Sequence, residues 1–245
     1  GALLLSFLFF FIIPKGLEVE EFYEYSLVTL YTSYLTFLTL GMEHSIIFLL
    51  SRNRELTSNG MLFMYSIISI SFLHFLIALL TLILNKYFHW YSMSFIGIIF
   101  VYSFFTSNLL VSNNLLRHKK YMAIVGFGNS LIFALPIIYY FINSQRISFS
   151  QLISIQIIAF ILTSLVHVLA NKKTFFIPIF KKKLFCYLLA LSLSFLIFNF
   201  TAGLSVNLYK SLLLSCLSIQ SYSSVNLLFS VFSGLFVLTS SVNFF

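Results

Sequence analysis

Long apolar runs alternate with short polar breaks along the whole chain of 245 residues. A helix needs about 20 apolar residues to cross a hydrocarbon core of about 30 Å. The apolar runs that predict such helices are 1–17, 25–50, 61–84, 93–116, 121–142, 151–170, 184–205 and 221–244. The polar breaks between them are 15–24, 51–60, 85–92, 117–120, 143–150, 171–183 and 206–220. The pattern predicts an all-α fold, a polytopic transmembrane helix bundle with about eight spans.

The composition excludes a water-soluble domain. Hydrophobic residues make up 60% of the chain and charged residues only 8%. A soluble domain carries roughly 25% charged residues, which cover its surface. This chain has too few of them, so most of its length is expected to lie in lipid.

Lysine and arginine divide unequally between alternate breaks. The first, third, fifth and seventh breaks hold Lys15, Lys86, Arg146 and Lys210. The second, fourth and sixth hold Arg52, Arg54, Arg117, Lys119, Lys120, Lys172, Lys173, Lys181, Lys182 and Lys183. Short loops rich in these residues stay on the cytoplasmic side. We therefore predict that the even breaks and the native N-terminus are cytoplasmic, which explains the net charge of +8 without a nucleic-acid partner.

The residues needed for common catalytic or metal sites are missing or scattered. The chain has no Asp, no Gly-rich phosphate loop and no His/Cys cluster with metal-ligand spacing. Cys186 and Cys216 lie in separate apolar stretches and are expected to be inert thiols. We predict no cofactor, no metal and no enzymatic activity. Because Gly1 and Phe245 both lie within apolar runs, we also expect the chain to be a fragment of a longer protein.

Polar side chains recur at helical spacing in the second and eighth runs. The two stripes are Ser26, Thr29, Ser33, Thr36 and Glu43, and, 197 residues later, Ser223, Asn226, Ser230, Ser233 and Ser240. Such stripes let membrane helices pack closely. They also line sites between the repeated halves of transporters. A repeat predicts a six-helix lobe over 1–170, a basic cytoplasmic loop over 171–183, and the first two spans of a truncated second lobe over 184–245.

Ionisable side chains at membrane depth are further candidates for functional residues. Glu43 and His44 lie about 12 Å from Arg52 along a helix, because each residue adds about 1.5 Å. Glu43 either couples transport to a proton or cation, or gates it, or forms a structural pair with His44 or Arg52. His74 and His167 stand alone in apolar runs, and we expect each to be a hydrogen-bonded packing residue.

The fourth run ends in a cationic turn. Ser103, Thr106, Ser107 and Asn114 share a helix face that leads to the turn at 117–120. These cations either meet a phosphate group entering from the cytoplasm or anchor the helix in the ordinary way. In the fifth run, Pro136 predicts a kink or a break.

Several short motifs resemble those of the bacterial O-antigen and polysaccharide flippases of the Wzx type. They are Glu20-Glu21-Phe22-Tyr23-Glu24-Tyr25-Ser26, Leu40-Gly41-Met42-Glu43-His44, Asn114-Leu115-Leu116-Arg117-His118-Lys119-Lys120, and the segment from Leu204 to Ser223. Two positions depart from the family pattern: Tyr23 stands at a usual glycine, and Asn207 at a frequent acid.

The resemblance implies a two-lobe fold similar to that of the multidrug/oligosaccharidyl-lipid/polysaccharide exporters. It implies flipping of undecaprenyl-pyrophosphate-linked oligosaccharide across a bacterial inner membrane, with contact to other polysaccharide-assembly membrane proteins. The predicted lining of the substrate cavity is Thr29, Ser33, Thr36, Glu43, His44, Ser107, Asn114, Asn226 and Ser230. The predicted phosphate-facing cations are Arg52, Arg117 and Lys120.

Two other functions compete with this interpretation. A membrane glycan polymerase or ligase usually carries a large outer loop, whereas the predicted outer breaks here are short. A drug or cation exporter of the same fold is expected to place more acids in the membrane than Glu43 alone.

Overall fold

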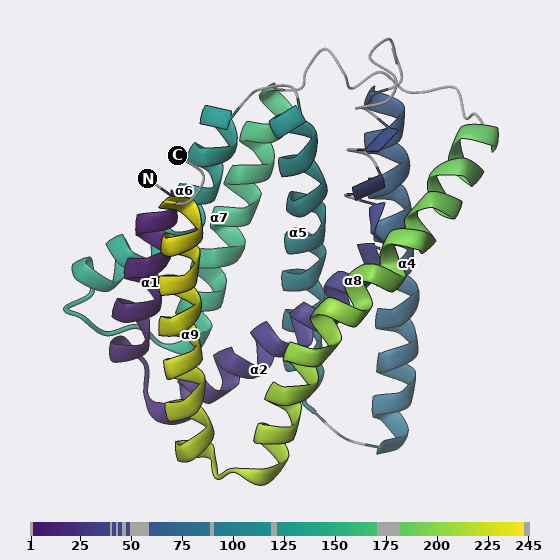
Figure 1. Cartoon of the computed structure of the whole chain (residues 1–245). Helices are drawn as coiled ribbons and strands as arrows, with labels where there is room; N and C mark the ends of the chain where they lie inside the picture. The colour runs from purple at the N-terminus through teal and green to yellow at the C-terminus, as the bar shows by residue number, and fades with distance from the viewer. Residues whose placement is uncertain are drawn as a thin grey trace. The chain divides into compact units, whose positions relative to one another are not determined.

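The computed structural model describes residues 2–39, 41–42, 44–45, 48–49, 59–88, 91–118, 122–170 and 182–242, which are almost entirely helical (Figure 1). The elements are α1 (Ala2–Gly16), α2 (Val19–Leu35), the 3-10 helix η1 (Thr36–Thr39), α4 (Asn59–Phe88), α5 (Met93–His118), α6 (Met122–Ile142), α7 (Phe149–Ala170), α8 (Lys182–Cys216) and α9 (Ile219–Val242). No strand occurs in these ranges, so the all-α prediction is confirmed.

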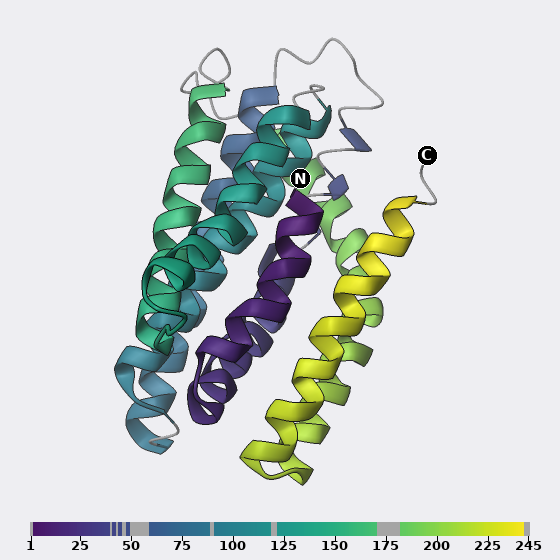
Figure 2. The same ribbon diagram turned by 90° about the vertical axis from the view of Figure 1, so that its left-hand side faces the viewer.

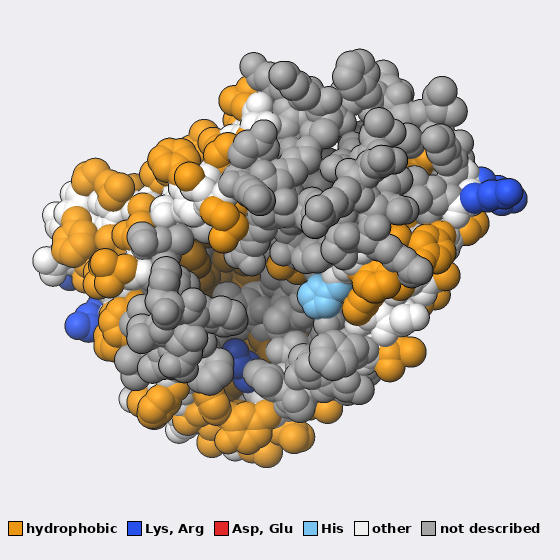
Figure 3. Space-filling model, turned by 45° about the horizontal axis from the view of Figure 1, so that its top comes forward, with side chains coloured by type: hydrophobic (Ala, Val, Ile, Leu, Met, Phe, Trp, Pro, Cys, Tyr) orange, Lys and Arg blue, Asp and Glu red, His pale blue; other side chains and the backbone are white. Residues whose placement is uncertain are grey.

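The helices include four that are long and apolar enough to cross a membrane. They are Tyr65–Tyr87, Met93–Asn113, Met122–Ile142 and Phe149–Ala170. In α4 the side chains of Phe72 and Phe75 are 61% and 68% exposed, as expected of a helix that faces lipid. Hydrophobic side chains also dominate the described part of the face drawn in Figure 3. The chain is therefore a multi-pass helical membrane protein, and the other predicted spans stay predictions.

The chain divides by its contacts into two compact units. Unit 1 contains residues 1–30, 123–166 and 208–245, and unit 2 contains residues 31–122 and 167–207. The helices α2, α7 and α8 contribute residues to both units, as does α6 through its first residue, Met122. The predicted lobes at 1–170 and 184–245 follow chain order instead, and that division stays a prediction.

Unit 1 is held together by rings and by close backbone approach. Helices α1 and α9 lie alongside one another (Figures 1 and 2). Phe9 of α1 packs edge-on against Phe133 of α6, with ring centroids 5.6 Å apart. A Cβ added to Gly16 would lie 2.5 Å from the Tyr140 ring, so glycine is needed where α1 ends.

The predicted outer break at 15–24 is wrong in its extent, because α2 begins at Val19. The Glu21 carboxylate accepts the backbone N–H of Glu18 at 3.2 Å and that of Phe149, at the start of α7, at 3.1 Å. Acidic side chains stabilise helix N-termini, where backbone N–H groups lack partners. The acids of this segment therefore start a helix instead of a loop.

The predicted span at 25–50 is wrong as one continuous helix. The α-helix ends at Leu35, η1 follows, and Gly41 has a left-handed backbone with φ of 70°. The Gly41 carbonyl then accepts the N–H groups of His44 and Ser45, which begins a new helical turn. A Cβ at Gly41 would lie 2.8 Å from Phe195 and 2.9 Å from the backbone nitrogen of Leu196. Packing against α8 therefore requires glycine here, and apolar periodicity does not reveal this.

One further predicted break is wrong in its extent, and the predicted break at Pro136 does not occur, whereas a kink at Pro136 stays a prediction. The break at 206–220 is mostly helix, because α8 continues to Cys216 and α9 begins at Ile219. The span containing Pro136 is not broken, since α6 runs from Met122 to Ile142. Membrane helices tolerate proline because neighbouring helices satisfy the backbone groups that it frees.

In unit 2, α4 and α5 pack against each other and run in opposite directions (Figure 1). The Asn85 side chain fixes the turn between them, since it donates to the Tyr91 carbonyl and accepts from the Tyr91 N–H. Inside unit 2, one hydrophobic cluster joins both helices to α8 and to the segment after η1. Its buried members are Met42, Leu49, Tyr65, Ile70, Val111 and Leu188.

Candidate functional site

The two polar stripes predicted in the second and eighth runs meet in unit 1. The Asn226 amide of α9 donates to the Ser26 hydroxyl of α2 at 2.7 Å, and Ser26 donates in turn to the Phe22 carbonyl. The rings of Tyr23 and Tyr222 pack edge-on, 5.7 Å apart, beside this pair. The stripes thus contact each other, which their shared register did not predict.

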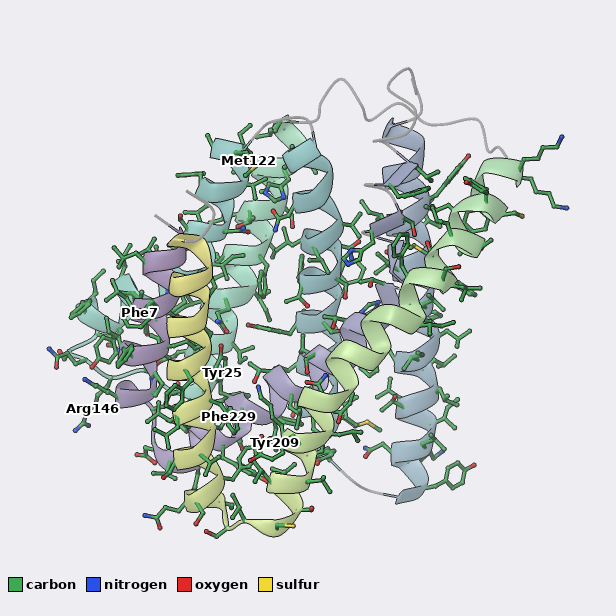
Figure 4. The ribbon with its side chains drawn as sticks, in the orientation of Figure 1. Phe7, Tyr25, Met122, Arg146, Tyr209 and Phe229 are labelled. Carbon is green, nitrogen blue, oxygen red and sulfur yellow. The ribbon has the colours of Figure 1, made fainter. Side chains whose placement is uncertain are left out.

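A second polar contact in unit 1 joins α2 to α7. The Gln156 amide donates to the Tyr25 hydroxyl at 3.3 Å, and both side chains are buried. Tyr25 lies among the helices of unit 1 in Figure 4. The same view shows Tyr209 and Phe229 side by side between α8 and α9, with ring centroids 5.6 Å apart. Gln156 was missed in the sequence, although an amide inside a long apolar run is a signal of such a bond.

In unit 2, hydroxyl groups join helices that are distant in the sequence. Ser33 of α2 donates to the Asn207 amide oxygen of α8 at 2.9 Å. Ser112 of α5 bonds His167 of α7, which confirms the prediction that His167 is a hydrogen-bonded packing residue. Asn207 is missing from the predicted site residues because its segment was taken for a loop.

The α2 stripe does not have one uniform role. Thr29 donates to the Ser26 carbonyl at 2.9 Å, and Thr36 donates to the Ser33 carbonyl at 2.6 Å. Both bonds lie within the chain segment that carries the hydroxyl, so these side chains contribute no bond between the helices that the structure describes. Ser26 and Ser33, in contrast, bond side chains of other helices. The interpretation of the stripe as a helix-packing surface is therefore supported at these positions.

The remaining predicted site residues are scattered or not described. His44 is exposed and packs edge-on against Phe195, with ring centroids 5.8 Å apart. Ser107 is completely buried in α5. Glu43, Arg52 and Lys120 lie outside the described residues, as do the side chains of Asn114, Arg117 and Ser230.

A different set of polar atoms stands out in unit 2. Each is buried and has no hydrogen-bond partner among the residues that the structure describes: Thr32 Oγ1, Ser69 Oγ, His74 Nε2, Ser103 Oγ, Ser107 Oγ and Asn108 Oδ1. An unsatisfied buried polar group costs about 1–3 kcal/mol. His74 also bonds the Ile70 carbonyl through Nδ1 at 2.9 Å, as predicted for a packing residue, but its second nitrogen was not anticipated.

Lys210 is the one cation of α8 beyond the predicted membrane run at 184–205. It is half-buried, and this burial lowers its pKa below the ordinary value of 10.5. The shift arises because desolvation disfavours the charged ammonium group.

Comparison with known proteins leaves the family open. A scan against protein-family models finds no match, and no curated protein or solved structure matches the chain.

Proposed function

We propose that this chain belongs to a transporter that flips undecaprenyl-pyrophosphate-linked oligosaccharide across a bacterial inner membrane. The proposal rests on the motif resemblance and on the distribution of cations between alternate breaks. A polar headgroup cannot cross about 30 Å of hydrocarbon unaided. The protein would have to supply a polar path for it.

The single structural observation that supports this proposal best is the interrupted second span. Leu35, η1 and the left-handed Gly41 break the helix within an apolar run. Irregular backbone at membrane depth is tolerated only where protein buries it or where it lines a watery cavity. Discontinuous helices of this kind form substrate and ion sites in transporters. Here the break directly precedes Glu43, the acid considered for coupling.

Polar contacts between helices give further support. Ser26 and Ser33 on α2 bond asparagine side chains of α9 and α8. These bonds hold α2 against its neighbours through polar side chains that face the interior of the bundle, as in membrane proteins with polar interiors. No comparable observation favours a polymerase or a drug exporter.

The test is a flipping assay with the full-length protein that contains this chain. Reconstituted into liposomes, it should move labelled undecaprenyl-pyrophosphate oligosaccharide from one leaflet to the other. Failure to move this lipid under any imposed ion gradient would show the proposal to be wrong.

A substitution assigns the coupling group separately. Glu43→Gln should abolish the dependence of flipping on pH, because the amide cannot exchange a proton. The matched control is Glu24→Gln, which changes an exposed acid of α2 and should leave flipping unaltered. If Glu43→Gln behaves like the control, Glu43 is not the coupling group.

A further inference from the structure

Most of the polar atoms without described partners in unit 2 lie on α4 and α5, whereas Thr32 Oγ1 lies on α2. Ile70 of α4 and Val111 of α5 belong to the same hydrophobic cluster. Because the helices are antiparallel, one turn further leads to His74 on α4 and to Ser107 on α5. The His74 ring packs edge-on against Phe104 of α5, with centroids 6.2 Å apart, in agreement with this register.

The tautomer of His74 follows from its one bond. Nδ1 lies 2.9 Å from the Ile70 carbonyl, and a carbonyl oxygen can only accept a hydrogen bond. Nδ1 therefore carries a proton, so Nε2 presents a lone pair when the ring is neutral. The His74 side chain is 3% exposed.

Hydrogen bonds likewise show which polar atoms of α5 can donate and which can accept. Asn108 donates its amide N–H to the Phe104 carbonyl at 2.8 Å, which leaves its Oδ1 as an acceptor. Ser103 and Ser107 lie one turn apart, both are 0% exposed, and each hydroxyl can donate or accept. These atoms have no hydrogen-bond partner within the described part of the chain.

The charged side chains near these atoms indicate which class of ligand fits them. Neither α4 nor α5 contains an acid, and η1 contains no ionisable residue. Besides His74, the described titratable side chains of these two helices are Tyr65, Lys86 and Tyr87 of α4 and Tyr102 of α5. A cation would find no carboxylate on α4 or α5, and an anion would face the acceptor atoms of His74 and Asn108.

We propose that His74, Ser103, Ser107 and Asn108 form a binding site for neutral hydroxyl groups. His74 Nε2 and Asn108 Oδ1 accept hydrogen bonds from the ligand, while the serine hydroxyls donate or accept. Two sources supply this chemistry: water, and the hydroxyl groups of a saccharide. The saccharide source rests on the proposed function, whereas the water source does not.

The experiment is nitrogen NMR of the histidine-labelled full chain in lipid nanodiscs. The variant His74→Gln assigns the signal of His74. In the wild-type chain, we expect the unprotonated Nε2 signal to lie upfield of its position in an apolar solvent, because accepting a hydrogen bond shifts it. His167, paired with Ser112, is the internal control and should be insensitive to changes at α4.

The two sources are distinguished by whether the nanodiscs contain the oligosaccharide. An upfield signal that correlates with water in plain nanodiscs identifies water as the ligand. A signal that shifts only when undecaprenyl-linked oligosaccharide is added identifies the saccharide. The double variant Ser103→Ala/Ser107→Ala should reduce either shift and leave His167 unchanged.

Two results would overturn the proposal. One is a Nε2 signal that keeps its apolar-solvent position with and without the oligosaccharide. The other is a His74 ring that carries protons on both nitrogens at neutral pH, since Nε2 then donates and cannot accept. Loss of flipping in the liposome assay with a normal His74 shift would refute the proposed function alone.

Discussion

The two units differ in how their buried polar groups are satisfied. In unit 1, Ser26 pairs with Asn226, Tyr25 with Gln156, and Thr163 with the Gly128 carbonyl. Among its described residues, only the Tyr222 hydroxyl is buried without a hydrogen-bond partner. Unit 2 also contains such pairs, but α4 and α5 add a group of buried polar atoms that no described residue satisfies.

The contrast indicates a division of roles. Paired polar groups between helices rigidify a bundle and specify one packing arrangement. Buried polar groups without partners are destabilising, and proteins usually keep them where a ligand or water completes the hydrogen bonds. Unit 1 therefore has the character of a scaffold, and the α4–α5 faces of unit 2 have that of a binding site.

The largest expected effect is at the break of the second span in unit 2. Gly41→Ala should lower the free energy of unfolding by about 2–5 kcal/mol, because alanine is strained at positive φ and its methyl group would overlap the α8 backbone. Thermal unfolding in detergent micelles measures the loss. Gly97→Ala is the matched control, since no packed neighbour among the described residues lies within 4 Å of the added methyl group, and it should be neutral or slightly stabilising.

The pairing in unit 1 is tested by removing one partner. Asn226→Leu should destabilise the chain by about 1–3 kcal/mol, because it removes the hydrogen bond to the buried Ser26 hydroxyl. Adding Ser26→Ala should cost less than the sum of the two single changes. Strictly additive losses in this double-mutant cycle would mean that the two side chains do not interact.

Removing a buried hydroxyl group in unit 2 should have a different effect on stability. Ser107→Ala breaks no hydrogen bond to a described residue, so we expect stability to change by no more than about 0.5 kcal/mol, or to rise. Ser112→Ala on the same helix is the control and should destabilise, because it removes the partner of His167. A loss at Ser107 as large as that at Ser112 would abolish the contrast between the units.

The smallest effect concerns Lys210 in unit 1. Its pKa is lowered on folding, so the folded state binds fewer protons than the unfolded state between the lowered pKa and 10.5, and stability rises with pH there. Lys210→Met should therefore stabilise the chain modestly at neutral pH, and the difference should disappear as pH rises above 10.5. A difference that does not vary with pH would show that charge burial is not its cause.

Particular residues show how much of the fold could be predicted from the sequence. The apolar runs at 93–116, 121–142 and 151–170 predicted helices whose ends agree closely with α5, α6 and α7. Lipid imposes this simple rule, because every backbone group in the membrane must be satisfied within its own helix. Polar residues misled the prediction at 15–24 and 206–220, where a helix cap and a buried asparagine look like loop residues.

The candidate site was harder to predict. The stripe containing Ser26 and Asn226 was visible at helical spacing, but helical spacing does not say which other helix a face will meet. The same limit hid Gln156 and Asn207, whose partners lie more than a hundred residues away. Ser103 and Ser107 were predicted to share one face of a helix, whereas His74 was expected only to be a packing residue.

By itself, the sequence determined that this is a helical membrane protein, since hydropathy depends only on which residues follow one another. The tertiary structure alone decided where the second span breaks, because the need for glycine at position 41 comes from the backbone of α8. It also decided which buried polar atoms find partners. Hydrogen bonding depends on distances of about 3 Å between atoms of different helices, and no order of residues along one helix specifies them.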